Sequence, residues 1–196
     1  MMAMLSALYI HRHSKGKNMN QKSVRNNKLT IKDIAVLGVM VATMTSFKYA
    51  MSLLPNIEPV SLLIILYTLF LGPKVIYAII VFVFVEGLIY GFGSWWICYL
   101  YIWPILSLLT HFLGKIVADV KQRIWTFSVL SALFGLFFGA LTSIPQFIMG
   151  GFAYGFSYFI AGIPYDLIHC VGNFIICLAL FYPLHTTLNK ISKYIL

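Results

Sequence analysis

The stretch VFVFVEGLIYGFGSWW (residues 81–96) combines an apolar run, of the kind that spans a lipid bilayer, with a single carboxylate, Glu86. An acid at the centre of a membrane helix costs about 2.5–3.5 kcal/mol on insertion scales, and such a residue usually faces a cavity or a partner. Glycine and aromatic residues follow the run at once. The fold must therefore supply a cavity or a partner group that offsets the cost of placing the Glu86 carboxylate within the membrane.

The whole chain has the composition of an integral membrane protein. Of its 196 residues, 61% are hydrophobic and 10% are charged, with a mean hydropathy of +0.90. A soluble domain carries roughly 25% charged residues, so this chain could not cover its own surface in water. Cys98, Cys170 and Cys177 lie singly in apolar runs, and we expect buried apolar side chains there instead of a disulfide or a metal site.

The sequence predicts an all-α integral membrane protein with six transmembrane helices in a single bundle. A helix needs about 20 apolar residues to cross the hydrocarbon. The predicted spans are Ile34–Leu54, Val60–Leu71, Val75–Tyr90, Trp95–Leu113, Trp125–Ile144 and Ile163–Leu184. Gly72 and Pro73 end the short second span, because proline neither donates to a helix nor permits a helical predecessor.

The basic residues fix the predicted orientation. With the N-terminus inside, 13 of the 14 Lys and Arg residues lie in cytoplasmic segments, and the remaining one, Lys48, lies within the first span. By the positive-inside rule both termini are cytoplasmic. The net charge of +9 is thus explained by the orientation of the protein in the membrane, and it gives no support to nucleic-acid binding.

Three regions follow from this arrangement. Residues 1–32 form a basic cytoplasmic arm, in which Met19 offers an alternative start that would make 1–18 an upstream extension. Residues 33–188 form the six-helix substrate-binding domain, and residues 189–196 form a short basic tail.

Polar residues inside the predicted spans gather at one depth, near the outer surface. Helical rise of about 1.5 Å per residue places Lys48 and Glu86 in the outer half of their spans. Asp166, His169 and Asn173 share one face of the last span at i, i+3 and i+7. Each of these residues also has a structural alternative. Lys48 could extend its ammonium to the outer membrane interface, or it could form a structural ion pair with Glu86. Asp166 could cap its helix, and His169 and Asn173 could form hydrogen bonds between helices.

Aromatic residues are concentrated on the predicted outer side, which favours a cavity there. Residues 145–162, PQFIMGGFAYGFSYFIAG, are uncharged and rich in glycine and aromatics, and we predict a mobile lid over an apolar ligand. The candidate substrate-binding residues are Lys48, Asn56, Glu58, Glu86, Tyr90, Trp95, Trp96, Tyr99, Trp103, Tyr165, Asp166, His169 and Asn173.

A stripe of small residues marks the first span. Ala35, Gly38 and Ala42 are three and four residues apart, and such spacing lets another helix approach closely. Its partner would be another protein chain or, alternatively, a helix of the same bundle.

Taken together, these features resemble the substrate-binding S component of an energy-coupling factor (ECF) transporter. The resemblance covers most of residues 30–190: six spans, a basic arm before DIAVLGVMVAT (33–43), the outer loop LPNIEP (54–59), an aromatic outer half, and GPK (72–74) after a short second span. It implies high-affinity capture of a vitamin or related micronutrient at a prokaryotic plasma membrane. A wide aromatic and apolar pocket with few charges suits a large, partly planar ligand, so we favour cobalamin over a pterin, a flavin or a pantothenate-like acid. For such an acid, Lys48 would be the counter-ion.

The resemblance also implies partners. Delivery inward would require a shared ECF transmembrane subunit and two ATP-binding-cassette ATPases, and Ala35, Gly38 and Ala42 would contact the shared subunit. Gly38 stands where an alanine is more usual in the family. We expect no cofactor, metal or catalytic residue.

Two other function classes remain as alternatives. A stand-alone proton- or ion-coupled carrier would relay protons through Glu86, Asp166 and His169, but internal repeats, which such carriers usually show, are not evident. An intramembrane enzyme would need a GxSxG or HExxH motif, and neither occurs in the sequence.

Overall fold

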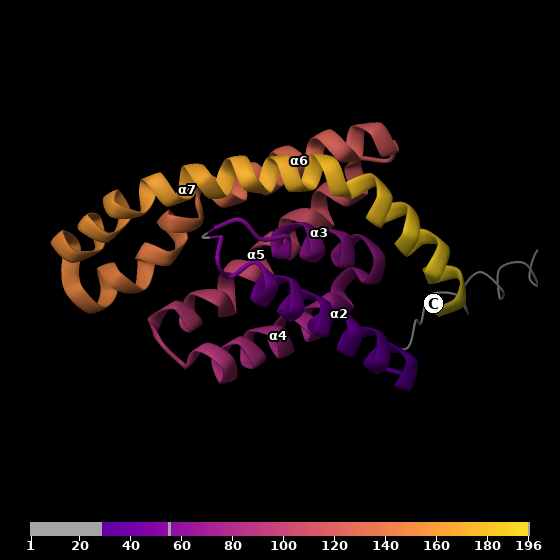
Figure 1. The fold of residues 1–196 in the computed structure, drawn as a ribbon, viewed down its shortest axis with the longest axis horizontal. Coiled ribbons are helices and arrows are strands. Elements are labelled where there is room, and N and C mark those ends of the chain that lie inside the picture. Colours follow the sequence, from indigo (N-terminus) through magenta and orange to yellow (C-terminus); the bar gives the residue numbers. More distant parts are fainter. Residues whose placement is uncertain (1–28, 55, 196) are drawn as a thin grey trace, which may run out of the picture. The chain divides into compact units, whose positions relative to one another are not determined.

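The computed structural model describes residues 29–54 and 56–195, with side chains as far as residue 193. In these ranges every regular element is a helix (Figure 1), which confirms the all-α prediction. The elements are α2 (Ile31–Ala50), α3 (Val60–Leu71), the 3₁₀ turn η1 (Gly72–Lys74), α4 (Val75–Tyr90), α5 (Ser94–Ile116), α6 (Val120–Leu136) and α7 (Phe138–Ile195). Most of the predicted basic arm, residues 1–28, lies outside the described residues.

The chain divides into two compact units, Met1–Asp33 and Ile34–Leu196. In the first, Thr30 and Asp33 exchange hydrogen bonds at the start of α2: the Thr30 amide donates to Asp33 Oδ2 (2.8 Å), and the Asp33 amide donates to Thr30 Oγ1 (3.1 Å). Such a reciprocal pair satisfies amides that the first turn of a helix leaves free. The second unit carries all the features described below.

Among the described residues, three apolar segments are long enough to cross a membrane, as expected of a multi-pass membrane protein. They are Val60–Tyr90, Ser94–Ile116 and Val120–Lys193. Six separate spans were predicted. The first of them, Ile34–Leu54, is not among the three segments, and helical turns continue through two of the predicted breaks. Gly72–Lys74 forms a 3₁₀ turn that joins α3 to α4, and residues 145–162 are helical within α7.

Helix α3 lies at the centre of the second unit. Its first nine residues, Val60–Thr68, are all buried, which is the expected position of a helix that is apolar on every side. It packs against α5 and α7, and its few hydroxyls are satisfied. The Thr68 hydroxyl donates to the Ile64 carbonyl (2.7 Å) and accepts from the Ser107 hydroxyl of α5 (3.1 Å).

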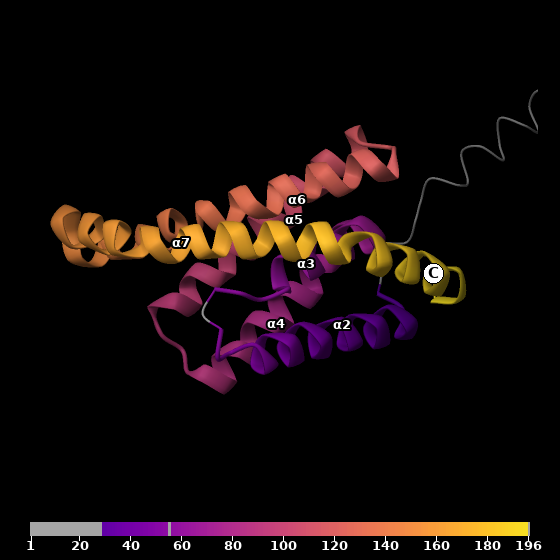
Figure 2. The ribbon, with the colours of Figure 1, turned by 45° about the horizontal axis from the view of Figure 1, so that its top comes forward.

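Helices α6 and α7 form an antiparallel pair, and Figures 1 and 2 both show α6 beside the C-terminal half of α7. The contacts fix the register of this antiparallel pair: as residue numbers increase along one helix, those of the facing residues decrease along the other. Gly139 meets Asp166, Gly135 meets the backbone of His169, and Asn173 bonds to Ser131.

The prediction of a lid loop at residues 145–162 is wrong. These residues are helical and belong to α7, which is broken at Gly151, where φ is +76°. Glycine adopts that backbone conformation without steric cost, so the glycines that suggested a loop instead allow the chain to turn back on itself within the α7 hairpin.

The close approach at Gly135 should make that position intolerant of a side chain. A Cβ atom there would lie 2.8 Å from the backbone of His169, whereas a Cβ at Gly38 would meet nothing within 4 Å. We predict that Gly135→Ala lowers stability by about 1–3 kcal/mol through overpacking, measured by thermal unfolding in detergent. Gly38→Ala, the matched control, should leave the unfolding temperature unchanged or raise it; equal behaviour of the two variants would contradict the packing.

Candidate functional site

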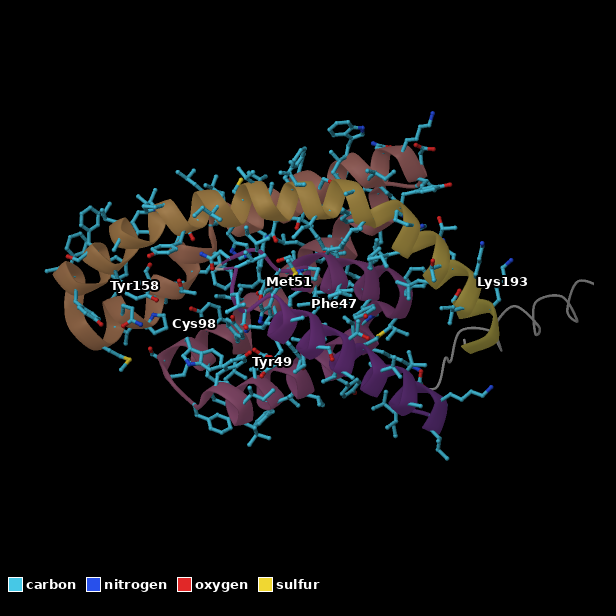
Figure 3. All side chains as sticks on the ribbon, in the orientation of Figure 1. Phe47, Tyr49, Met51, Cys98, Tyr158 and Lys193 are labelled. Carbon is cyan, nitrogen blue, oxygen red and sulfur yellow. The ribbon has the colours of Figure 1, made fainter. Side chains whose placement is uncertain are left out.

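The ends of three helices and one connecting segment enclose a cavity of about 320 Å³. Its walls come from the end of α2, residues 51–58, the end of α4 and the start of α5; Met51, labelled in Figure 3, lies on the segment after α2. The lining residues are Lys48, Met51, Ser52, Leu54, Asn56, Glu58, Tyr90, Trp95 and Tyr99.

Two helical stripes contribute Tyr90, Trp95 and Tyr99 to the cavity wall. On α4, Phe82, Glu86 and Tyr90 recur every four residues, and on α5 the residues Trp95, Tyr99 and Trp103 do the same. Residues four apart lie on one face of a helix. The turn between these helices needs only three residues, because Gly91, with φ +87°, lets the chain reverse sharply.

An ion pair between Lys48 and Glu86 compensates the buried acid. Lys48 Nζ lies 2.5 Å from Glu86 Oε2; the Glu86 side chain is 0% exposed and that of Lys48 is 16% exposed. Lys48 also donates to the Tyr99 hydroxyl (3.0 Å). Of the alternatives drawn from the sequence, the structure contains the Glu86–Lys48 pair, and Lys48 does not snorkel away from the bundle.

Aromatic rings surround the Lys48 ammonium. It lies 4.5 Å from the centroid of Tyr99, 5.7 Å from Tyr90, and 5.9 Å from both Phe82 and Trp95. Cations within about 6 Å of a ring face are attracted by its quadrupole. The rings therefore stabilise a charge that has been taken out of water, and three of them, Tyr90, Trp95 and Tyr99, also line the cavity.

Glu58 and Asn56 lie on the connecting segment at the cavity. Asn56 has a positive φ of +58° and donates from Nδ2 to the backbone carbonyl of Tyr165 (3.2 Å), which ties the segment to α7. Burial raises the pKa of Glu58, an effect that the Lys48 ammonium partly offsets and Glu86 reinforces. In the described part of the chain, no group donates a hydrogen bond to the Glu58 carboxylate.

The remaining polar residues of the predicted cluster lie elsewhere, in the α6–α7 and α3–α7 interfaces. Asp166 accepts from the Gly139 amide (2.8 Å), and Asn173 donates to Ser61 Oγ (3.2 Å) and to the Ser131 carbonyl (3.1 Å). Asp166 does not cap its own helix, because α7 runs through it. Asn173 forms the interhelical hydrogen bonds that the sequence offered as its alternative role.

His169 and Trp103 connect the two regions through aromatic contacts. The His169 ring lies 4.9 Å from Phe138, which lies 5.9 Å from Trp103. Both His169 nitrogens and the Trp103 indole nitrogen are buried without a hydrogen-bond partner among the described residues. These side chains do not line the cavity.

The structure thus places some of the thirteen predicted binding residues at the cavity and the others away from it. Six of them line the cavity: Lys48, Asn56, Glu58, Tyr90, Trp95 and Tyr99, with Glu86 at its base. Trp96 instead donates to the Val83 carbonyl (2.9 Å), and Tyr165 offers only its backbone to Asn56. Sequence reasoning missed Met51, Ser52 and Leu54, whose only signal was their place just before, or at the start of, the LPNIEP segment.

The small-residue stripe on α2 is exposed. Ala35, Gly38 and Ala42 all face away from the described part of the second unit, and nothing lies within 4 Å of a Cβ built at Gly38. The alternative in which Gly38 packs inside the bundle is therefore wrong for the described residues. All three cysteines are free, and Cys98 and Cys177 are buried.

No protein-family model matches the sequence, and no curated protein or solved structure matches it either.

The buried ion pair should be sensitive to loss of one partner. We predict that Glu86→Leu costs about 3–5 kcal/mol, because it leaves the Lys48 ammonium without its carboxylate. The double variant Lys48→Met with Glu86→Leu should regain most of that loss, since neither charge is then buried. Thermal unfolding in detergent measures both; a double variant as unstable as the single one would show that the pair does not account for the loss.

Proposed function

We propose that this protein captures a small micronutrient of the vitamin class at the cavity beside Lys48 and serves as the S component of an ECF transporter. The observation that carries the proposal is the cavity of about 320 Å³ lined by aromatic rings and charged side chains. Binding pockets for small molecules combine apolar walls with a few convergent polar groups in this way.

The proposed topology has six spans, with both termini in the cytoplasm. It rests on the distribution of Lys and Arg. Apart from Lys48 at the end of α2, the basic residues in the described part of the chain would all lie on the cytoplasmic side: Lys32, Lys74, Lys115, Lys121, Arg123, Lys190 and Lys193. In that orientation the ends of α2 and α4 and the start of α5 face outward, so the cavity would open to the outside. That is the side from which a nutrient must be taken up.

The size of the cavity supports a ligand smaller than cobalamin. A volume of about 320 Å³ lies at the low end of the range for small-molecule pockets, and a corrin ring with its side chains needs far more space. A ligand of one or two rings fits the proposal better.

The carrier alternative receives no support from the site. A proton relay would need Glu86, Asp166 and His169 in sequence, yet Glu86 is paired with Lys48, and Asp166 bonds to the Gly139 backbone.

Calorimetry of the purified protein against a vitamin panel that includes cobalamin, a flavin, a pterin and pantothenate tests the capture proposal. We expect one panel member to bind, and Trp95→Ala to weaken that binding about tenfold or more, equal to about 1.4 kcal/mol, because a wall of the cavity is lost. Trp125→Ala is the matched control, since Trp125 is exposed on α6 outside the cavity. The proposal is overturned if no panel member binds and none of a cationic, a neutral and an anionic single-ring probe binds either.

The partner assignment predicts a different phenotype at Gly38. Gly38→Leu should abolish uptake by cells that contain the complete transporter, because a bulky side chain would keep the shared subunit from approaching α2 closely. Ligand binding to the detergent-solubilised variant should be unchanged. Normal uptake by cells carrying Gly38→Leu would mean that the shared subunit docks elsewhere.

A further inference from the structure

Two charged side chains, Lys48 and Glu58, line the cavity, and a third, Glu86, is buried behind Lys48. The charges of the three do not balance. Lys48 carries one positive charge, whereas Glu86 and Glu58 each carry a negative charge when ionised. The Lys48 ammonium is already bound by Glu86 at 2.5 Å and by the Tyr99 hydroxyl at 3.0 Å. It is therefore not free to serve as the counter-ion of an acidic ligand without first giving up its carboxylate.

Glu58 is the carboxylate of the cavity that receives no hydrogen bond. Its side chain lines the cavity, and among the described residues nothing donates a hydrogen bond to it. Burial raises the pKa of Glu58, and the Lys48 ammonium, which is itself paired with Glu86, only partly offsets that effect through space. A cation bound in the cavity would further favour the ionised form of this carboxylate.

The walls beside Glu58 indicate what kind of cation could bind. Tyr90, Trp95 and Tyr99 line the same cavity, and aromatic faces attract organic cations. A divalent metal ion would need about six oxygen ligands, and no cluster of three or more metal-ligating side chains exists in the part of the chain that the structure describes. The geometry therefore favours an organic cation.

We propose that the captured ligand is a small organic cation, either a ring with a fixed positive charge or a protonated amine, held by the Glu58 carboxylate and by the faces of Tyr90 and Trp95. This inference rests on the proposed capture function and narrows its substrate class. It excludes the carboxylic acid for which Lys48 would have been the counter-ion.

Three probes that share one ring test the charge preference: 1-methylnicotinamide as a cation, nicotinamide as a neutral molecule and nicotinate as an anion. Calorimetry on the full-length protein at pH 7.5 should show the cation binding about tenfold or more tightly than nicotinamide, with nicotinate weakest. Glu58→Gln should reduce the preference for the cation over nicotinamide to about twofold or less.

Asp119→Asn is the matched control for Glu58→Gln. It removes one negative charge from an exposed position at the start of α6, and asparagine keeps the capping role of Asp119. This variant should retain the preference for the cation.

The pH dependence gives a second readout. The charge of 1-methylnicotinamide is permanent, so a change in its affinity reports on the protein. Its binding should tighten as pH rises and Glu58 loses its proton, and Glu58→Gln should lack that rise. The other titratable groups of this region are Lys48, Glu86, Tyr90 and Tyr99. Because they are unchanged in Glu58→Gln, the difference between that variant and the unmodified protein reports on the Glu58 carboxyl.

The outcomes separate this inference from the capture proposal. If nicotinate binds most tightly, or if all three probes bind equally, the cation class is wrong and capture stands. If none of the three binds at millimolar concentration while a neutral or acidic member of the vitamin panel does, the cation class is again wrong. If neither the probes nor any panel member binds, both proposals fail.

Discussion

The ion pair between Lys48 and Glu86 is the interaction on which the architecture of this site depends. It joins α2 to α4, and through the Tyr99 hydroxyl it also joins both to α5. Helix α2 otherwise has few close neighbours among the described helices. Because each charge would be costly alone in an apolar bundle, the pair constrains where α2 ends, and the end of α2 forms one wall of the cavity.

The same chain uses two different ways to bury polar groups. Around the cavity, charges are neutralised by one another and by aromatic faces. Between α3, α6 and α7, by contrast, neutral groups and backbone atoms satisfy Asp166 and Asn173. The first arrangement borders a cavity and includes Glu58, a carboxylate without a hydrogen-bond donor among the described residues. The second is closely packed around glycines.

Much of the fold could be predicted from the sequence because hydropathy determines where apolar helices begin and end. The bounds Val60–Leu71 and Val75–Tyr90 agree with α3 and α4. What could not be predicted is which helices meet. Asp166 shares a predicted depth with Glu86, yet depth does not specify the neighbouring helix, and the α6–α7 register directs Asp166 to Gly139. At residues 145–162, glycine content suggested a loop, but tertiary pairing of the two arms overrides that local preference.

The break at Gly151 has a geometric consequence. The helical path from Val120 to Gly150 is continuous across Phe137, and 31 residues at about 1.5 Å each extend for about 46 Å. The hydrocarbon core of a bilayer is about 30 Å thick. A rod of that length must lean or protrude beyond the acyl chains, so the uncharged, aromatic tip around Gly151 would reach the level of the lipid headgroups, where tyrosine and phenylalanine side chains can anchor the protein at a fixed depth.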